Sequence, residues 1–289
     1  KKNKNYNFIK LNINNFKKIK KTIFNIKPVI VYHLAAESHV DNSIKNPKNF
    51  IDSNIVGTYN LVNICNQYIK QKKIKNFKFL HVSTDEVYGS LNKSQKKSIE
   101  KDPYLPNSPY SASKASSDMI VRAWNKTYNF PSIITNCANN YGIYQHPEKL
   151  IPKVVFCILK NKSIPLYGDG KNIREWIHVE DHVLALIKIS KNGKIGESYN
   201  IGSGILKKNI DIVKLICKFA DKIINKKSKS SSLIKFVIDR QGHDFKYALN
   251  SNKIRKTLGF KNKKNFQKEL FKIVNWYIDN KKWLLSKSK

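Results

Sequence analysis

The sequence predicts an α/β protein with a doubly wound parallel sheet and a smaller second lobe. Two observations carry this prediction: short apolar runs alternate with longer amphipathic segments between Pro28 and Asn200, and polar clusters follow several of the apolar runs. Buried parallel strands give short apolar runs, and their connecting helices give amphipathic segments. Ligands of such sheets bind beyond the carboxyl ends of the strands, so the polar clusters are candidates for a functional site.

This alternation of apolar and amphipathic segments predicts where the strands and helices lie along the sequence. Strands are predicted at residues 29–35, 77–82, 132–137, 174–179 and 198–201. Helices are predicted at residues 49–70, 109–129 and 179–191, the second one favoured by the proline near its start. Residues 1–143 and 173–202 are expected to form the dinucleotide-binding, Rossmann-like domain. Residues 144–172 and 203–289, with helical patterns at 209–224 and 265–276, are expected to form an interleaved α+β substrate lobe.

The beginning of the chain lacks a pattern that a dinucleotide fold normally has. Such a fold opens with a strand, a glycine-rich turn that meets the pyrophosphate, and a second strand ending in an acidic residue. Nothing before Pro28 shows this pattern, and residues 7–11 are only a marginal strand candidate. We therefore expect an N-terminally truncated fold without its first strand and glycine-rich loop.

Composition limits the function classes. The 289 residues are 40% hydrophobic, which fits a globular protein. The net charge of +35 comes from lysines on nearly every segment, and we interpret it as a bias of exposed positions, not as a specific nucleic-acid surface. The four cysteines show no CxxC spacing, which favours a reducing, cytoplasmic setting. No run approaches the roughly 18–20 apolar residues that cross a membrane.

Two polar clusters are the strongest functional signals. Ser-Thr-Asp-Glu-Val-Tyr-Gly at residues 83–89 follows a predicted strand, and Tyr110 and Lys114 lie four apart at the start of a predicted helix. Residues four apart share a helix face, and a nearby ammonium lowers a tyrosine pKa from about 10. Asp85 and Glu86 offer two carboxyls that can hold opposite protonation states. Alone, the Tyr/Lys spacing also arises by chance, and the Asp–Glu pair also fits a solvated turn.

Further motifs extend this pattern along the chain. They are HLAAESHVD at 33–41, NIVGTY at 54–59, NCANNYG at 136–142, PEKLIP at 147–152, YGDGKNIR at 167–174 and DRQGHD at 239–244. With the two clusters, they resemble the extended short-chain dehydrogenase/reductase superfamily and, within it, the dTDP-glucose 4,6-dehydratase family. The Tyr/Lys spacing is widespread in that superfamily, whereas the Thr-Asp-Glu triplet and the Asn-Asn-Tyr-Gly run are more specific.

The resemblance implies an NAD-dependent hydro-lyase of deoxysugar synthesis, commonly for rhamnose and surface polysaccharide. Tyr110, its pKa lowered by Lys114 and the nicotinamide cation, would take the proton of the sugar 4-hydroxyl as hydride passes to NAD. Glu86 would then remove the C5 proton, and Asp85 would protonate the departing 6-hydroxyl. Return of hydride to C6 gives dTDP-4-keto-6-deoxyglucose. Thr84 would hydrogen-bond the 4-oxygen, and Lys114 would bind the ribose.

The resemblance also implies two sets of binding residues. The expected NAD contacts are Tyr110, Lys114, Asn12, Ile13, Leu34, Ala35, Ala36, Glu37, Ser38, Ser53 and Asn140. The expected dTDP-glucose contacts are Ser38, Thr84, Asn139, Lys149, Leu150, Pro165, Leu166, Tyr167, Arg174, Asn209, Asp239, Arg240, Gln241, Gly242 and His243. Lys149 and Arg174 suit a diphosphate because both form charge-assisted hydrogen bonds.

The expected partners are the nucleotide-sugar and a second copy of the chain. Family members are usually homodimers, so helices 49–70 and 109–129 are expected to form a four-helix interface. No metal is expected, because His178 and His182 lie four apart without a set of further ligands.

Departures from the family pattern leave alternatives open. Asn12 stands where the family has Asp at the adenine, and Gln241, Lys246 and Asn250 stand where it has Pro, Arg and Asp. One alternative is another nucleotide-sugar short-chain enzyme, a 4-epimerase or decarboxylase, although these typically lack the Asp–Glu pair. The other is a non-catalytic remnant or polyanion-binding protein, favoured by the missing glycine-rich loop and the charge.

Overall fold

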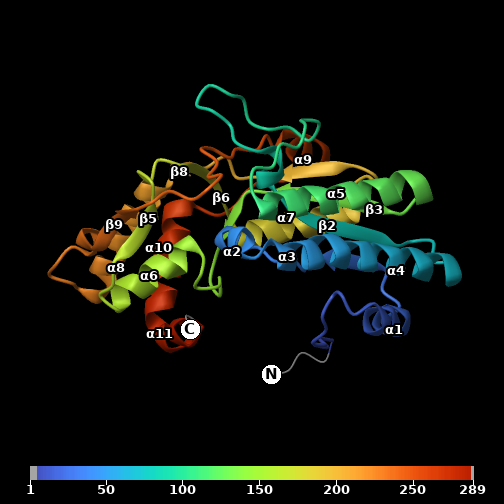
Figure 1. Ribbon diagram of the computed structural model, residues 1–289, viewed down its shortest axis with the longest axis horizontal. Helices are drawn as coiled ribbons and strands as arrows, with labels where there is room; N and C mark the ends of the chain where they lie inside the picture. Colours follow the sequence, from blue (N-terminus) through green and yellow to red (C-terminus); the bar gives the residue numbers. More distant parts are fainter. Residues whose placement is uncertain (1–4, 288–289) are drawn as a thin grey trace.

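The computed structural model describes residues 5–287, which form two parts side by side (Figure 1). The helices are α1 (Phe16–Ile26), α2 (Val40–Lys45), α3 (Pro47–Phe50), α4 (Gly57–Gln71), α5 (Pro109–Tyr128), α6 (Leu150–Leu159), α7 (Val179–Asn192), α8 (Asn209–Ile224), α9 (Asn252–Leu258), α10 (Phe266–Asp279) and α11 (Lys281–Ser286). The strands are β1 (Ile30–His33), β2 (Lys78–Thr84), β3 (Ser132–Cys137), β4 (Asn139–Tyr141), β5 (Ile164–Tyr167), β6 (Ile173–His178), β7 (Ser198–Ile201), β8 (Leu206–Lys208) and β9 (Ile234–Val237). One segment is π-helical, η1 (Ile51–Val56). Two are short 3₁₀ helices, η2 (Asp85–Tyr88) and η3 (Ser230–Leu233).

The first part is built on a four-stranded parallel sheet with helices on both faces. Its strand order is β1-β2-β3-β7. Successive residues of a strand point to opposite faces, so Phe79 packs with α4 and α5 whereas Leu80 packs with α7 and α9. This is the predicted doubly wound α/β fold. Its carboxyl edge carries the ends of β1, β2 and β3, because parallel strands end at the same edge.

The predicted helices form, one of them with a π-helical segment. Helix α5 begins with a capping box on Ser108 and Pro109 as its first residue, and it ends at Asn129 in the left-handed conformation. The helix predicted over residues 49–70 forms as a continuous helical run of α3, η1 and α4, in which the π-helical η1 widens the middle. This wider turn contains Asn54, whose side chain bonds the backbone of Glu37 and the hydroxyl of Ser113.

The second part has smaller sheets around a helical core. Strand β4 pairs with β6 in parallel and β6 with β8 in antiparallel orientation, while β5 pairs with β9. Helices α6, α8 and α10 pack together over a large buried apolar cluster. The strand predicted at 174–179 forms as β6, but its place in the main sheet was wrong. The chain leaves that sheet after Cys137, and β6 pairs with the outgoing strand β4.

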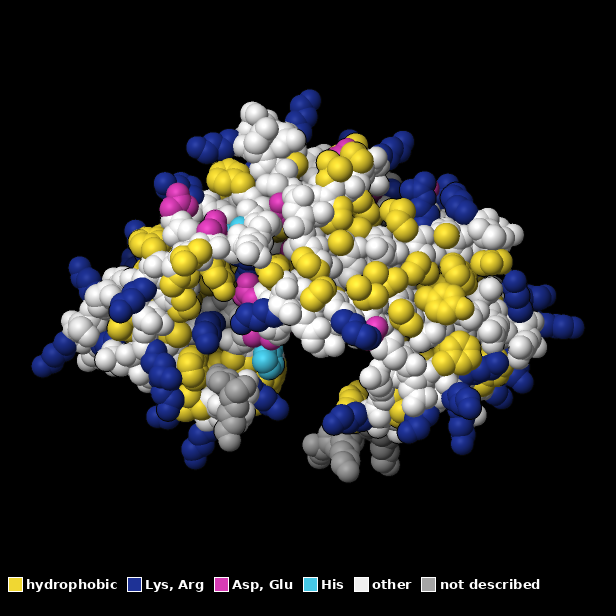
Figure 2. All heavy atoms as spheres, viewed as in Figure 1, with side chains coloured by type: hydrophobic (Ala, Val, Ile, Leu, Met, Phe, Trp, Pro, Cys, Tyr) yellow, Lys and Arg dark blue, Asp and Glu magenta, His cyan; other side chains and the backbone are white. Residues whose placement is uncertain are grey.

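Two further predictions concern the N-terminal residues and the distribution of surface charge. The strand candidate at 7–11 is wrong: these residues are irregular, and Phe8 and Ile9 are exposed. Lys and Arg side chains are spread over the face shown in Figure 2 instead of gathering in one patch. Within residues 5–287, no helix has both the length and the apolar character that a membrane crossing requires.

Candidate active site

The two predicted clusters meet at the carboxyl end of β2. Strand β2 ends at Thr84, and the single turn η2 then carries Asp85 and Glu86. Gly89 closes this turn with a φ of 76°, and a Cβ there would lie 2.2 Å from the carbonyl oxygen of Leu105. Only glycine fits this position, so the chain turns away sharply and leaves both carboxyl groups directed into the protein.

Asp85 is a buried carboxyl group with few partners. Its side chain is 3% exposed, Oδ1 accepts a hydrogen bond from the Thr84 hydroxyl at 3.2 Å, and Oδ2 has no hydrogen-bond partner among the described residues. Burial, followed by the charges of Glu86 and Glu175, raises the pKa of Asp85 well above its ordinary value. The environment therefore favours the neutral acid, which can donate a proton.

Glu86 lies in a different environment. Its Oε2 lies 3.4 Å from the Tyr247 hydroxyl, whose proton is directed to the much nearer Asp244. Burial raises its pKa overall, and the charges of Arg174, Arg240 and Lys149 partly counteract this rise. Because three cations oppose the burial, Glu86 is the member of the pair that is better able to stay ionised. Adjacent residues thus supply an acid and a base.

Tyr110 and Lys114 share one face of α5, as predicted, while the lowering of the Tyr110 pKa by Lys114 together with the nicotinamide cation stays a prediction. Burial and the charge of Glu86 raise the pKa of Tyr110 well above its ordinary value, and a hydrogen bond with Thr84 only partly counteracts them. The ammonium of Lys114 donates to the carbonyl oxygen of Val82 at 2.9 Å, and burial lowers its own pKa. In the chain by itself, Tyr110 is a phenol.

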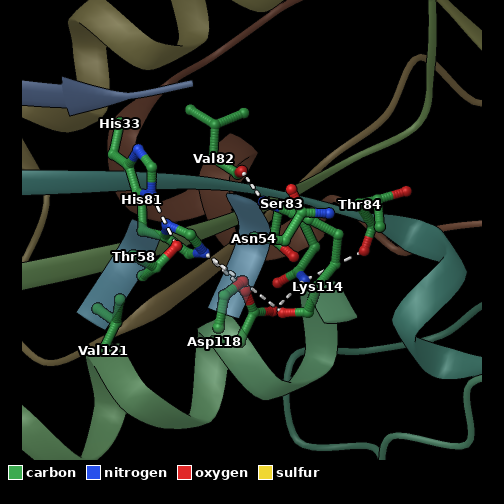
Figure 3. A network of polar contacts seen from close by, with 12 residues as sticks. His33, Asn54, Thr58, His81, Val82, Ser83, Thr84, Lys114, Asp118 and Val121 are labelled. Carbon is green, nitrogen blue, oxygen red and sulfur yellow. Dashed lines mark hydrogen bonds and ion pairs between the residues drawn. The ribbon is translucent and has the colours of Figure 1, made fainter. Parts of the chain in front are cut away.

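A buried polar network lies behind Lys114 (Figure 3). Asp118, one turn further along α5, is fully buried; its carboxylate contacts His81 Nε2 at 3.0 Å and accepts hydrogen bonds from Tyr104 at 3.0 Å and Asn136 at 3.2 Å. Burial and the charge of Lys114 lower the pKa of His81, so this ring stays neutral. The charge of Asp118 raises the pKa of Lys114 against the effect of burial. Asp118 is thus the buried anion that balances the ammonium.

A cavity of about 450 Å³ opens beside Glu86. It brings together most of the predicted sugar-nucleotide residues: Ser38, Asn139, Lys149, Leu150, Pro165, Leu166, Tyr167, Arg174, Asn209, Arg240, Gly242 and His243. Of the remaining predictions, Thr84 lies beside Tyr110, Asp239 holds His243 at 2.6 Å, and Gln241 is exposed; none of the three lines the cavity.

The two residues predicted to bind a diphosphate already have partners on the protein. The Arg174 guanidinium donates to the carbonyl oxygen of Asp244 at 3.0 Å and lies 4.4 Å from the ring centre of Tyr247. Lys149 donates to the carbonyl oxygen of Ser38 at 2.6 Å. These contacts fix both cations at the cavity wall.

Sequence reasoning missed several lining residues. They are His39, Val40, Asp41, Ser108, Glu148, Lys153, Trp176, Asp244 and Tyr247. Asp41 and Asp244 end motifs that were recognised, and each lies within three residues of a predicted contact. Asp244 accepts hydrogen bonds from Asn107 and from the hydroxyl of Tyr247.

The predicted cofactor residues are only partly brought together. Residues 34–38 follow β1 as an exposed segment, anchored through Glu37 by Asn54 next to Ser53. Tyr110 and Lys114 lie near the end of β2. The other predicted cofactor residues make contacts within the protein. Asn12 accepts a hydrogen bond from the backbone of Asn14, Ile13 packs into the core around α4, and Asn140 is hydrogen-bonded to His182 at 2.9 Å. No group of three potential metal ligands occurs among residues 5–287.

Comparison with known proteins identifies the family. A family model described as GDP-mannose 4,6 dehydratase matches residues 1–273. A dTDP-glucose 4,6-dehydratase of Escherichia coli is 49% identical over 265 residues, which cover 88% of this chain and 73% of that protein. The enzyme of the same name from Neisseria meningitidis is 46% identical, covering 97% and 81%. The chain belongs to the dTDP-glucose 4,6-dehydratase family.

A solved structure of this family has the same fold. DesIV, a dTDP-glucose 4,6-dehydratase from Streptomyces venezuelae whose crystal structure has NAD bound, superposes with a TM-score of 0.88 at 37% identity. The match covers 97% of this chain and 82% of that one. The predicted membership of this dehydratase family is therefore confirmed.

The environment of Asp85 gives a prediction for stability. Between the ordinary pKa of 3.8 and the raised pKa, the folded state binds a proton that the unfolded state releases, so the wild-type fold loses stability as pH rises. We expect Asp85→Asn to raise the free energy of unfolding by about 1–3 kcal/mol at pH 8 and to change it little below pH 3.8. Urea unfolding across pH measures this, with Asp169→Asn, an exposed site, as control. A wild type as stable as the variant at pH 8 would contradict it.

The Asp118 network gives a second prediction. Removing the Asp118 charge leaves the buried ammonium of Lys114 without the carboxylate that counteracts its burial, and it weakens the contact with His81. Asp118→Asn is therefore expected to lower the free energy of unfolding by about 3–5 kcal/mol. Asp52→Asn breaks the exposed pair with Lys48, which has the same spacing, and is expected to cost less than about 1 kcal/mol. The double variant Lys114→Met/Asp118→Asn should lose less than the sum of its single variants. Equal costs for the Asp118 and Asp52 variants in urea unfolding would refute the role of Asp118.

Proposed function

We propose that the chain converts dTDP-glucose to dTDP-4-keto-6-deoxyglucose and water with NAD as cofactor. One observation carries this proposal: a neutral acid, Asp85, and an ionisable base, Glu86, stand side by side next to Tyr110, and Glu86 faces a cavity lined by cations. Elimination of water needs such a pair, and a nucleoside diphosphate needs the cations. The names of the relatives and the NAD in the solved relative support the same reading.

The residues at the ends of β1 and β2 fit the nicotinamide half of NAD. Residues 34–38 leave the carboxyl end of β1 accessible, and Tyr110 and Lys114 lie at the neighbouring strand end. Residues 1–56 contain no glycine, so none of them forms a glycine-rich turn for the pyrophosphate. When bound, NAD supplies a hydride acceptor for C4 and a hydride donor for C6. The residues described here hold its nicotinamide and ribose end.

The side chains of the chain then move protons in a fixed order. Tyr110, hydrogen-bonded to Thr84, accepts the proton of the sugar 4-hydroxyl. The resulting ketone makes the hydrogen on C5 acidic, and Glu86 removes it. Asp85 donates its proton to the 6-hydroxyl, which leaves as water. The burial of Asp85 keeps that proton from the solvent until the leaving group takes it.

The test of this proposal follows the sugar by NMR in deuterated water. Protein with dTDP-glucose and NAD is expected to give a 4-keto-6-deoxy sugar with solvent deuterium at C5. Glu86→Gln should slow exchange at C5 and elimination together by about 10²–10⁴-fold. Asp85→Asn should slow elimination while C5 of the unreacted sugar still exchanges, because only the acid is lost.

A control separates these roles from general damage. Glu180→Gln removes an exposed carboxylate paired with Lys264 and is expected to leave turnover unchanged. If dTDP-glucose were converted to its 4-epimer and not to the 4-keto-6-deoxy sugar, the chain would be an epimerase and the proposed function would be wrong. Loss of C5 exchange in Asp85→Asn but not in Glu86→Gln would reverse the two roles.

The chain is proposed to act as a cytoplasmic homodimer through the outer faces of α4 and α5. Hydrophobic side chains gather over these helices in Figure 2. The exposed hydrophobic residues of α4 and α5 include Tyr59 and Met119, which are 42% and 46% exposed. All four cysteines are free thiols, as in a reducing compartment.

The dimer is tested by sedimentation. Met119→Glu places a charge within the proposed interface and is expected to shift the protein from dimer to monomer. Leu184→Glu changes a residue of similar exposure, 44%, on α7 across the sheet and should remain dimeric. A wild-type protein that sediments as a monomer would refute the proposal, as would dissociation by Leu184→Glu alone.

A further inference from the structure

Asp41 joins the two parts of the molecule at the wall of the cavity. It is the second residue of α2, which follows β1, and its carboxylate reaches two residues of the other part. Oδ1 accepts a hydrogen bond from Nε of Arg240 at 2.6 Å, and Oδ2 accepts one from the hydroxyl of Tyr167 at 3.1 Å. All three residues line the cavity. One side chain thus connects residues that are 126 and 199 positions away in sequence.

The guanidinium of Arg240 is contacted at one edge and on one face. At the edge, Nε donates a hydrogen bond to Asp41, and on the face the ring centre of Tyr167 lies 5.0 Å from the guanidinium carbon. A carboxylate on the Nε side leaves the edge formed by Nη1 and Nη2 for a second anion. A guanidinium edge matches two oxygens of a phosphate. The contacts with Asp41 and Tyr167 therefore orient the group without occupying this edge.

The ion pair between Asp41 and Arg240 is partly shielded from solvent. The side chains of Asp41 and Arg240 are only 23% and 21% exposed, so solvent screens their attraction less than at a free surface. The hydrogen bond and charge of Arg240 outweigh the burial of Asp41 and hold its pKa below the ordinary value. Asp41 is therefore ionised at neutral pH and keeps Arg240 in place.

Holding Arg240 also protects the proposed base. The charge of Arg240 acts on Glu86, whose carboxylate must remain without a direct cation partner to accept a proton. The other cations of the cavity are fixed by backbone carbonyls, Lys149 by Ser38 and Arg174 by Asp244. Lys149 also lies 3.8 Å from the Glu148 carboxylate, whereas Arg240 is the one of these three that donates a short hydrogen bond of 2.6 Å to a carboxylate.

We propose that Asp41 is a positioning residue for the diphosphate of the nucleotide-sugar. It fixes Arg240 and Tyr167 in the conformation that meets a diphosphate oxygen, so that binding does not have to order a long, flexible side chain. Immobilising such a side chain costs about 0.5–1.5 kcal/mol, which corresponds to roughly a 2- to 13-fold change in affinity. The inference rests on the proposed function in one respect: a nucleoside diphosphate binds in this cavity.

The test measures binding of dTDP without NAD, so that it does not depend on turnover. Isothermal titration calorimetry is expected to show that Asp41→Asn binds dTDP roughly 2- to 13-fold more weakly than the wild type. Asp41→Glu, which keeps the charge, should recover part of the loss. Asp52→Asn, at an exposed carboxylate on the same part of the chain, should bind like the wild type.

Two further arms separate positioning from structural damage. Thymidine, which lacks the diphosphate, should bind Asp41→Asn and the wild type equally in ligand-observed NMR. In an Arg240→Ala background, Asp41→Asn should cost little further dTDP affinity, because the residue it positions is gone.

The outcomes distinguish this inference from the proposed function. A wild type that binds dTDP while Asp41→Asn binds it equally well or more tightly overturns the role of Asp41 alone. Equal losses for thymidine and dTDP also overturn it, since they indicate a general change of the cavity. A wild type that does not bind dTDP overturns the proposed function and this inference with it.

Discussion

The burial of ionisable groups at the carboxyl end of β2 is the constraint on which the rest of the site depends. Within one strand end and the first turns of α5, the protein encloses two carboxyls, a phenol and an ammonium. Taking a charge out of water is costly unless it is paired. The charge of Asp118 counteracts the burial of Lys114, and the cavity cations partly counteract the burial of Glu86. At Asp85, burial and the neighbouring carboxylates outweigh the charge of Arg174, and this makes it an acid.

The wall opposite these groups is held by contacts between distant segments. Residues 89–107 run as an arm along residues 244–250: the backbone of Leu91 bonds Lys246, that of Ser98 bonds Ala248, and Asn107 bonds Asp244. The buried carboxylate of Glu175 holds the backbone of Leu249 at 2.7 Å. Support of this kind fixes Tyr247, whose hydroxyl is bonded to Asp244 and lies 3.4 Å from Glu86.

Sequence reasoning reached what local pattern and motif determine. The four strands of the main sheet and α5 with its Tyr/Lys face follow from periodicity and capping, and most of the cavity lining was predicted from the family resemblance. The π-helical turn, the place of β6 and the Asp41 bridge depend on which distant segments meet, and a single sequence does not contain that information. The same holds for the pKa of Tyr110 in the chain alone, which burial and the charge of Glu86 raise and which the spacing to Lys114 does not reveal.

The burial of Tyr110 determines what a cofactor would have to supply at this site. A phenol with a raised pKa is no base at neutral pH, and the ammonium of Lys114 is directed to the carbonyl oxygen of Val82. Ionisation of Tyr110 therefore requires another positive charge nearby. Tyr110 and Lys114 would hold the nicotinamide end of NAD, whose oxidised ring would supply such a charge. The burial that makes the tyrosine a poor base in the chain alone would thus couple its protonation to the bound cofactor.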